Sequence, residues 1–520
     1  MSTAPERRGA SSFAALCETH AVCSYTAFLE RTARMVPGKV AVIFGDRTWT
    51  YSRMFGAIAD LAGHLSVTLG VNRGERVALL VDNSDCYQFW YLAVLATGAV
   101  AVPLNTRLTA REIGYQIGNA GVVRILSQAK FSAVLAEVGV DWVDADAFLS
   151  VTGPRFDIAA AAIEPDASAA IYYTSGTTGN PKGVVHTHRS LIAGTIQGPP
   201  AWEYDDPDAV TLAMTPLFHI ANHTWFLPVL HTGGTMVVST FGSEGTLDLI
   251  ARRRITHVFA VPTMLMMMCE HHRKSGQDLS HVRTVAFGAS AMPPEKLADL
   301  QRMFPRAGLV HGMGQTESCG TIVTLPSALA FEKAGSVGVH VDGMDLRVVD
   351  DTGRDASAGS VGELVARGLN VMSGYHESPD ATAQALAGGW LHTGDLGYLD
   401  DEGFLFLVDR KKDMIIRGGE NIYSSEVENV LYMLPAVAQA AVIPARSELF
   451  GEEVFAFVVL SPEATEEAAC DEAAIREHCR RHLAGYKVPV GVRFVATLPQ
   501  TATGKVQKHL LRELLPANLR

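Results

Sequence analysis

The sequence of 520 residues predicts an α/β protein, with a large N-terminal part of several layered sheets and flanking helices and a small C-terminal domain. The chain is too long for one hydrophobic core, so about three or four domains or subdomains are expected. Amphipathic helical stretches alternate with short apolar runs through the first half, a pattern typical of mainly parallel sheets. Charged residues and glycines interrupt the apolar pattern over residues 407–431, which predicts a domain boundary there.

The clearest helix and strand patterns of the first half lie between residues 51 and 104. Residues 51–65 ("YSRMFGAIADLAGHL") have helix periodicity, and the apolar runs 76–81 and 98–104 predict buried strands. Further along, residues 256–272 ("THVFAVPTMLMMMCEHH") pass from a strand pattern into a helix pattern. Four methionines of this helix are interpreted as core residues, because no ligand pattern accompanies them. They are Met264, Met266, Met267 and Met268.

Composition limits the classes of function. The formal net charge of −12 disfavours a nucleic-acid surface, which needs a clustered basic face. The seven cysteines are scattered, with no CxxC spacing, which favours a reduced cytoplasm over a disulfide framework and indicates no zinc site. There is no signal-peptide pattern and no apolar run of about 18 residues. We therefore expect a cytoplasmic protein without a membrane span.

Residues 174–183 ("TSGTTGNPKG") form the most specific short pattern. Glycines let a backbone approach a ligand closely, and exposed N–H groups with hydroxyls form a nest for phosphate oxygens. The loop follows one strand-like run and precedes another, so we expect a strand-to-strand loop. A P-loop is disfavoured because Pro181 precedes Lys182 and no helix follows. A plain Gly/Ser/Thr turn is the alternative.

With its flanks, this loop ("YYTSGTTGNPKGVVHTH", 172–188) resembles the phosphate loop of the adenylate-forming (ANL) superfamily, which contains acyl-CoA synthetases, adenylation domains and luciferases. Further motifs of that superfamily follow in the family's order. They are "TPLFHIANH" (215–223), "FGASAMPP" (287–294), "GMGQTES" (312–318), "GELVARG" (362–368), "GWLHTGDLG" (389–397), "DRKKDMIIRGGENIYSSEVE" (409–428) and "LPQTATGKVQK" (498–508). The chain is most similar in these motifs to AMP-dependent acyl-CoA synthetases of the 4-coumarate and fatty-acid type.

The resemblance implies a two-step reaction. A carboxylic acid and ATP give an acyl-adenylate and pyrophosphate, and the thiol of CoA then takes the acyl group. Both steps develop charge at phosphorus or at the carbonyl, so fixed donors and cations should supply most of the catalysis. The implied cofactors and cosubstrates are ATP, Mg²⁺ and CoA.

The resemblance places the ATP site on several motifs. The implied ATP-binding residues are Thr174, Ser175, Gly176, Thr177, Thr178, Gly179, Lys182, Gly288, Ala289, Ser290, Met313, Gly314, Gln315, Thr316, Asp395, Arg410 and Lys505. Glu317 is the implied Mg²⁺ ligand, and Asp395 the implied partner of the ribose hydroxyls. Read alone, Asp395 could be a turn residue in "TGDLG".

The implied catalytic residues are Lys505, His219, Thr316 and Glu317. Lys505 matches the family lysine that reaches the substrate carboxylate and the α-phosphate, whereas Lys182 is an accessory charge. A lysine near a C-terminus is otherwise a solvated side chain, so this assignment depends on the motif. His219 matches a residue near the carboxylate, with a core histidine as the alternative.

The acid site is expected around the segments after His219, 287–289 and 310–319. The implied substrate-binding residues are His219, Ala221, Asn222, Phe287, Gly288, Gly312 and Ser318. Small residues at Ala221 and Ala286, where 4-coumarate ligases carry larger ones, suggest room for a medium-sized acid. Both an aryl acid (benzoate or cinnamate type) and a medium- or long-chain aliphatic acid fit. Met313 stands where the family usually has a tyrosine against adenine, and its thioether can pack on a ring face.

The resemblance also predicts domain rotation between the two steps. The expected parts are a large domain over residues 1–409, a hinge over 410–413 that contains Lys412, and a small mobile α+β domain over 414–520. After rotation, Gly418, Gly419 and Glu420 would contact CoA.

Two other functions compete with a CoA ligase. An adenylating enzyme could pass the acyl group to a carrier protein or another nucleophile, and no carrier domain follows Lys505 in this sequence. A catalytically inactive nucleotide-binding protein is the alternative from a different class. The expected partners are a small carboxylic acid, ATP and CoA, with no nucleic acid, and a homodimer is the candidate assembly.

Overall fold

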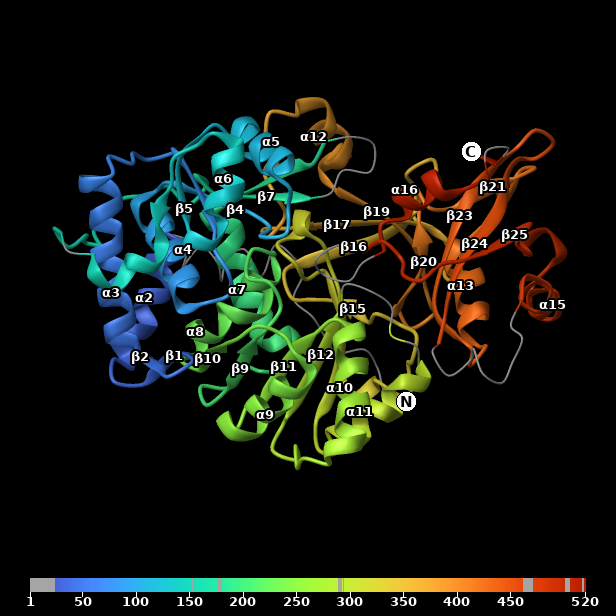
Figure 1. The fold of residues 1–520 in the computed structure, drawn as a ribbon, viewed down its shortest axis with the longest axis horizontal. Coiled ribbons are helices and arrows are strands. Elements are labelled where there is room, and N and C mark those ends of the chain that lie inside the picture. The colour runs from blue at the N-terminus through green and yellow to red at the C-terminus, as the bar shows by residue number, and fades with distance from the viewer. Residues whose placement is uncertain are drawn as a thin grey trace. The chain divides into compact units, whose positions relative to one another are not determined.

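The computed structural model describes residues 24–151, 153–174, 180–288, 292, 294–461, 471–500, 506–516 and 519–520. The chain divides into two units, residues 1–346 with 365–392 and residues 347–364 with 393–520. Figure 1 shows the elements of both units. The predicted α/β class is confirmed, because sheets with flanking helices build the large first unit.

A nine-stranded sheet forms one layer of the first unit. Its strands, in spatial order, are β15 (Val339–His340), β14 (Val323–Leu325), β13 (Gly308–Met313), β12 (Thr284–Gly288), β11 (His257–Ala260), β9 (Val210–Ala213), β10 (Thr235–Val238), β1 (Val40–Phe44) and β2 (Arg47–Thr50). The strands from β13 to β1 are parallel, and the antiparallel ones lie at the two ends. The expected mainly parallel arrangement is therefore confirmed for this sheet.

Helices cover one face of this sheet. They are α9 (Ser243–Arg253), α10 (Pro262–Ser275) and α11 (Pro294–Met303), which lie along the sheet in Figure 1. Leucines and isoleucines of these helices pack on the strands as one buried cluster. Of the four methionines, Met268 is buried and Met264 and Met266 pack against that cluster. Met267 is 49% exposed, so the core interpretation was wrong for it, because it points to the solvent face of α10.

A seven-stranded sheet forms the second layer. In spatial order it consists of β18 (Gly374–Tyr375), β8 (Lys182–Thr187), β7 (Ser168–Thr174), β4 (Val100–Pro103), β3 (Arg76–Leu80), β5 (Val122–Ser127) and β6 (Val143–Asp144). The strands from β7 to β6 are parallel, and β8 and β18 are antiparallel to their neighbours. The predicted strands at 76–81 and 98–104 are confirmed as β3 and β4.

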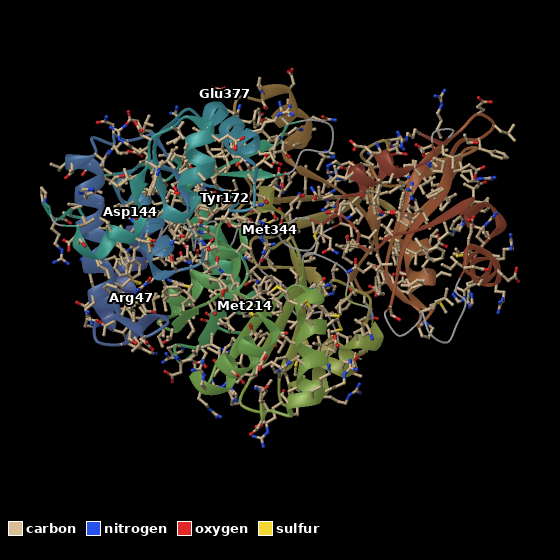
Figure 2. All side chains as sticks on the ribbon, viewed as in Figure 1. Arg47, Asp144, Tyr172, Met214, Met344 and Glu377 are labelled. Atoms are coloured by element: carbon tan, nitrogen blue, oxygen red, sulfur yellow. The ribbon has the colours of Figure 1, made fainter. Side chains whose placement is uncertain are left out.

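The remaining helices of the first unit flank these sheets. They are α2 (Tyr25–Met35), α3 (Tyr51–Gly63), α4 (Asp85–Thr97), α5 (Ala110–Ala120), α6 (Ser132–Val138), α7 (His188–Ala201), α8 (Pro228–Thr232) and α12 (Pro379–Ala385). Helix α3 confirms the predicted helix at 51–65. Every residue of α4 is buried, as expected of a helix that is apolar nearly all round. In Figure 2, Tyr172 and Met214 lie inside this unit, and Glu377 lies at its edge.

The second unit contains a five-stranded sheet of β22 (Glu420–Ile422), β21 (Ile415–Arg417), β24 (Gly451–Leu460), β23 (Val437–Ser447) and β25 (Gly491–Phe494). Its helices are α13 (Ser424–Tyr432), α15 (Glu472–His482) and α16 (Lys508–Leu511). A further sheet comprises β16 (Met344–Val349), β17 (Gly362–Gly368), β19 (Leu391–Leu399) and β20 (Leu405–Arg410). Among the described residues, no helix is long and apolar enough to cross a bilayer.

Candidate functional site

The pattern "TSGTTGNPKG" lies in a β-hairpin. Strands β7 and β8 are antiparallel, and Thr174 at the end of β7 faces Lys182 at the start of β8. The Thr174 hydroxyl donates to the carbonyl oxygen of Lys182 over 3.5 Å, which closes the base of the loop. The predicted strand-to-strand connection is confirmed, and a P-loop is excluded because a P-loop joins a strand to a helix.

Strand β8 and its neighbour β18 bring a cation, a phenol and a carboxylate together. The Lys182 ammonium lies 5.0 Å from the centre of the Tyr375 ring. The Tyr375 hydroxyl donates to Oε1 of Glu317 over 2.8 Å, and burial together with the Glu317 charge raises the pKa of Tyr375. The backbone N–H of Met372 donates to the Glu317 carbonyl over 2.8 Å. Side chain and backbone of Glu317 are therefore both held.

A buried histidine connects β8 with Thr316. His186 is fully buried, and its Nε2 lies 2.7 Å from the carbonyl oxygen of Thr316, to which it donates. Burial lowers the pKa of His186 to about 4, so the imidazole is neutral at pH 7. Its Nδ1 lies 3.1 Å from the Ser190 hydroxyl. We call Lys182, His186, Thr316, Glu317 and Tyr375 the β8 cluster.

The turn after β13 is built by close backbone approach. A Cβ added to Gly314 would lie 1.2 Å from the carbonyl oxygen of Gly320, so only glycine fits there. The Ser318 hydroxyl accepts from the Gln315 N–H over 3.2 Å and lies 3.0 Å from the Gln315 carbonyl oxygen. Ser318, predicted to contact the acid, thus has its hydroxyl occupied within the turn. Met313 ends β13 and is 9% exposed.

Two residues of "TPLFHIANH" have different surroundings. Nε2 of His219 is enclosed and has no hydrogen-bond partner among the described residues. Burial lowers the pKa of His219 to about 4, so a neutral imidazole is available. Asn222 is fully buried and exchanges two amide hydrogen bonds, of 2.6 and 3.2 Å, with Gln88 of α4. The amide of Asn222 is therefore engaged with the scaffold, whereas His219 has a free nitrogen.

Gly288 and Gly312 lie side by side, because β12 and β13 pair them in register. Successive side chains of a strand point to opposite faces. Phe287 accordingly packs in the cluster under α9–α11 and stacks on His311 at 4.9 Å. The structure therefore brings the two glycines together on one face of the sheet and places the Phe287 ring on the other. Ala221, also predicted to contact the acid, lies directly before the buried segment Asn222–Phe226.

In the second unit, two of the predicted residues form a pair. Asp395 of β19 and Arg410 of β20 are register partners, with Nε and Oδ1 3.2 Å apart. Asp395 lies within a strand and is 7% exposed, so the turn interpretation does not describe it.

Gly418 and Gly419, with φ of +59° and +92°, form the two-residue turn between β21 and β22. Glu420 beside this turn and Lys412 before β21 are exposed.

Several predicted residues lie outside the described residues. They are Ser175, Gly176, Thr177, Thr178, Gly179, Ala289, Ser290 and Lys505. Conversely, the sequence analysis did not identify two residues of this region, namely His186 and Tyr375. His186 lies in the run "VVHTH" (184–188), directly after the phosphate loop. A histidine inside an apolar strand pattern was the signal that could have identified it as a buried polar residue. Tyr375 lies in no motif, so only the fold reveals it.

The residues around Glu317 fit Mg²⁺. Among the described residues, no three His, Cys, Asp or Glu side chains gather as a metal cage. Mg²⁺ is commonly held by one or two carboxylates together with substrate phosphates and water. Glu317 supplies one carboxylate, and Tyr375 holds its Oε1. When bound, the ion would neutralise charge on the phosphates of ATP.

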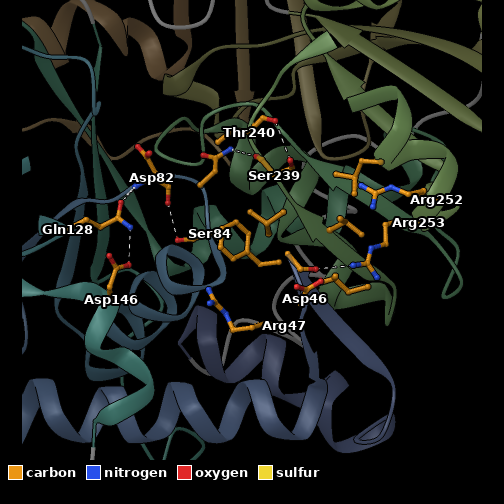
Figure 3. A pocket seen from close by; sticks show the side chains of 17 residues that line it. Asp46, Arg47, Asp82, Ser84, Gln128, Asp146, Ser239, Thr240, Arg252 and Arg253 are labelled. Carbon is orange, nitrogen blue, oxygen red and sulfur yellow. Dashed lines mark hydrogen bonds between the residues drawn. The ribbon is translucent and has the colours of Figure 1, made fainter. Parts of the chain in front are cut away.

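A separate cavity of about 550 Å³ opens beside β1 and β2 (Figure 3). Charges of both signs line it, among them Asp46, Asp82, Arg252 and Arg253. Arg47 at its wall is held by two hydrogen bonds of 2.7 Å to the buried Asp85. None of its lining residues belongs to the predicted site, so this cavity is distinct from the β8 cluster.

Comparison with known proteins agrees with this arrangement. A model of the family "AMP-binding enzyme" matches residues 29–376, and one of the "AMP-binding enzyme C-terminal domain" matches residues 426–505. A feruloyl-CoA synthase of Amycolatopsis is 37% identical over 493 residues, covering 93% of this chain and 97% of the relative. A long-chain-fatty-acid–CoA ligase of Mycobacterium tuberculosis is 34% identical, covering 91% and 94%.

A solved structure resembles the whole fold. The o-succinylbenzoate–CoA synthetase of Bacillus subtilis, in complex with ATP and a magnesium ion, gives a TM-score of 0.83 at 31% identity, over 93% of this chain and 98% of that one. The same enzyme has been solved with its acyl-adenylate intermediate. Fold and site thus define an adenylate-forming α/β protein. The chain belongs to the AMP-binding enzyme family.

Proposed function

We propose that this protein is an AMP-forming acid–thiol ligase, which activates a carboxylic acid with ATP and transfers the acyl group to CoA. The observation that carries the proposal is the β8 cluster. Around the strand that follows the phosphate loop, it gathers the Lys182 ammonium, the Glu317 carboxylate and the turn that contains Thr316. The relatives named for CoA ligation, over nearly the whole chain, support the same reaction.

The residues of the first unit have separate roles in this proposal. The loop from Thr174 to Lys182 would hold the β- and γ-phosphates, and Lys182 would add a positive charge. Thr316 would contact the α-phosphate, and Glu317 would bind Mg²⁺. His219, neutral and with a free Nε2, would lie beside the acid. Fixed groups of this kind stabilise charge that develops during transfer without reorganising.

The residues of the second unit would complete each step in turn. Asp395 would accept hydrogen bonds from the ribose, with Arg410 beside it. Lys505 would bridge the substrate carboxylate and the α-phosphate of ATP, where two negative groups must meet.

We propose rotation of residues 414–520 about a hinge at 410–413, after which Gly418, Gly419 and Glu420 would contact CoA. A Lys412→Pro variant that makes thioester at the normal rate would argue against this hinge.

Acid-dependent exchange of pyrophosphate into ATP tests the first step. Lys505→Ala is expected to lower this exchange at least about 100-fold, the typical effect of removing one donor to developing charge. Lys487→Ala is the matched control, since Lys487 forms an ion pair of 2.7 Å with Glu426 in the same unit. Exchange that survives Lys505→Ala unchanged would overturn the assignment.

Omission of CoA tests the acceptor. AMP release that needs CoA supports a CoA ligase, whereas release at the same rate without CoA would favour a carrier protein or another nucleophile. The acid is aryl or aliphatic in this proposal, as among the named relatives. If no acid supports AMP release although the protein still binds ATP, the chain is an inactive nucleotide-binding protein instead.

We also propose a cytoplasmic location, supported by the free, buried state of the described cysteines Cys86, Cys269, Cys319 and Cys479. Fractionation of cells that express the tagged chain tests this.

A homodimer is the proposed assembly, and a single monomer mass in light scattering would contradict it.

A further inference from the structure

Trp202 lies where three segments of the expected acid site meet. It is the residue directly after α7, and it is 3% exposed. Its ring packs edge-to-face on Trp225, from the segment after His219, with centroids 5.9 Å apart. It packs in the same manner on Phe259 of β11 at 5.8 Å. On its remaining side the ring lies next to the paired glycines of β12 and β13, within reach of a Cβ added to either one.

Apart from Phe259, the face of the sheet under Trp202 is made of small residues. Strand alternation and register place Phe259, Ala286, Gly288, Val310 and Gly312 on this face, opposite the helices α9–α11. Small side chains suggest open space. That space is not open over Gly312, because a Cβ added there would lie 2.3 Å from Cη2 of Trp202. The indole therefore fills the volume that Gly312 leaves and borders that of Gly288, where an added Cβ would lie 3.8 Å from Cη2 of Trp202.

The position of Trp202 is well fixed. Its Nε1–H donates to the Thr321 hydroxyl over 2.9 Å, and its backbone N–H donates to the Gly198 carbonyl over 3.0 Å. The next residue, Glu203, has a φ of +55°, and its carboxylate accepts from the N–H and the hydroxyl of Ser327. Moving the indole aside would break its bond to Thr321, and the backbone bonds on either side hold the position from which the side chain starts. Trp202 is thus a wall of the site rather than a mobile gate.

We propose that Trp202 closes the acid site at Gly288 and Gly312 and makes this enzyme selective for compact aryl acids over long-chain aliphatic acids. This inference rests on the proposed function, because it takes the two glycines as part of the acid site. A long alkyl chain that passed over the glycines would collide with the indole. A single planar ring ends before it and can pack against its edge, a favoured arrangement of aromatic pairs. Trp202 is a specificity-determining residue in this proposal.

Pyrophosphate release with benzoate, cinnamate, hexanoate and dodecanoate tests the proposal. The wild-type kcat/KM should be at least about 100-fold higher for the better aryl acid than for dodecanoate, and Trp202→Ala should lower this ratio at least about tenfold. Trp202→Leu serves if the alanine variant does not fold. Trp90→Phe is the matched control, a buried tryptophan of α4 whose Nε1–H bonds to Ala145 instead. An unchanged ratio in a folded Trp202 variant overturns the proposal.

Thermal shift with two non-hydrolysable analogues, benzoyl- and dodecanoyl-sulfamoyl adenosine, reads the acid site without catalysis. The benzoyl analogue should raise the Tm of the wild type and the dodecanoyl analogue should not, whereas both should raise that of Trp202→Ala. Equal shifts in the wild type, or no shift with the benzoyl analogue, overturn the proposal. If no acid releases pyrophosphate while the two analogues still differ, the proposed function fails and the closure by Trp202 stands.

Discussion

Tyr375→Phe isolates one hydrogen bond of the β8 cluster. The substitution keeps the ring that faces Lys182 and removes the hydroxyl that donates to Glu317 over 2.8 Å. Hydrogen bonds to a charged group contribute about 1.5–3 kcal/mol, and the partial exposure of both side chains favours the lower end. A loss of about 1.4 kcal/mol corresponds to a tenfold change in an equilibrium constant. We therefore expect about tenfold weaker use of Mg²⁺, since Glu317 is no longer oriented.

The assay is pyrophosphate release at fixed ATP and acid while Mg²⁺ is titrated. Tyr51→Phe is the matched control, because it loses a buried hydrogen bond of 2.7 Å to the Gly234 carbonyl without touching Glu317. It should lower stability and leave the Mg²⁺ midpoint unchanged.

A double-mutant cycle with Glu317→Gln separates orientation from general damage. If Tyr375 acts through Glu317, then Tyr375→Phe should have little further effect on the Mg²⁺ midpoint in the Glu317→Gln background. The same midpoint in the wild type and Tyr375→Phe would refute the reasoning.

Three further predictions concern pH, a half-buried ion pair and the adenine site. His186 has a native pKa of about 4, below its unfolded value of 6.5, so the unfolded chain binds the proton first and stability falls as pH drops from 6.5 to 4. In urea unfolding, His186→Gln should reduce that slope by up to about 1.4 kcal/mol per pH unit, and an unchanged slope would contradict this. Lys508→Met leaves Glu428, its partner at 2.8 Å, as a half-buried carboxylate without a cation. The variant should lose up to roughly 3 kcal/mol of unfolding free energy, the lower limit for a fully buried pair, and most of it should return on adding Glu428→Gln; no recovery would speak against the pair. Met313→Tyr should keep activity and change the KM for ATP at most about tenfold, roughly 1.4 kcal/mol, and complete loss would refute packing of Met313 on adenine.

Much of the fold was predictable because local patterns survive in the structure. The helix period of residues 51–65 and the apolar runs at 76–81 and 98–104 correspond to α3, β3 and β4. The hairpin around the phosphate loop was readable because both flanks are apolar and Pro181 cannot donate in a helix. Met267 was misplaced because methionine enters both core and surface, and the neighbouring core methionines hid the helix period.

The side-chain partners at the site were not predictable. Asn222 and Ser318 are polar residues in the right motif, yet their polar groups bond to Gln88 and within the turn at Gln315. Trp202 is far in sequence from Gly312, and only the register of β12 and β13 places their glycines beneath it. Tertiary pairing of this kind depends on the arrangement of distant segments, which no local pattern reports.

Strand β8 has a consequence for the spacing of the proposed phosphate contacts. Lys182 begins the strand and His186 follows four residues later, about 13 Å away along an extended chain. Because β7 and β18 hold this strand on both sides, the two positions move as one rigid element. In the proposed function, a phosphate bound at Lys182 and the Thr316 turn that His186 holds would therefore be kept at one separation by the strand itself.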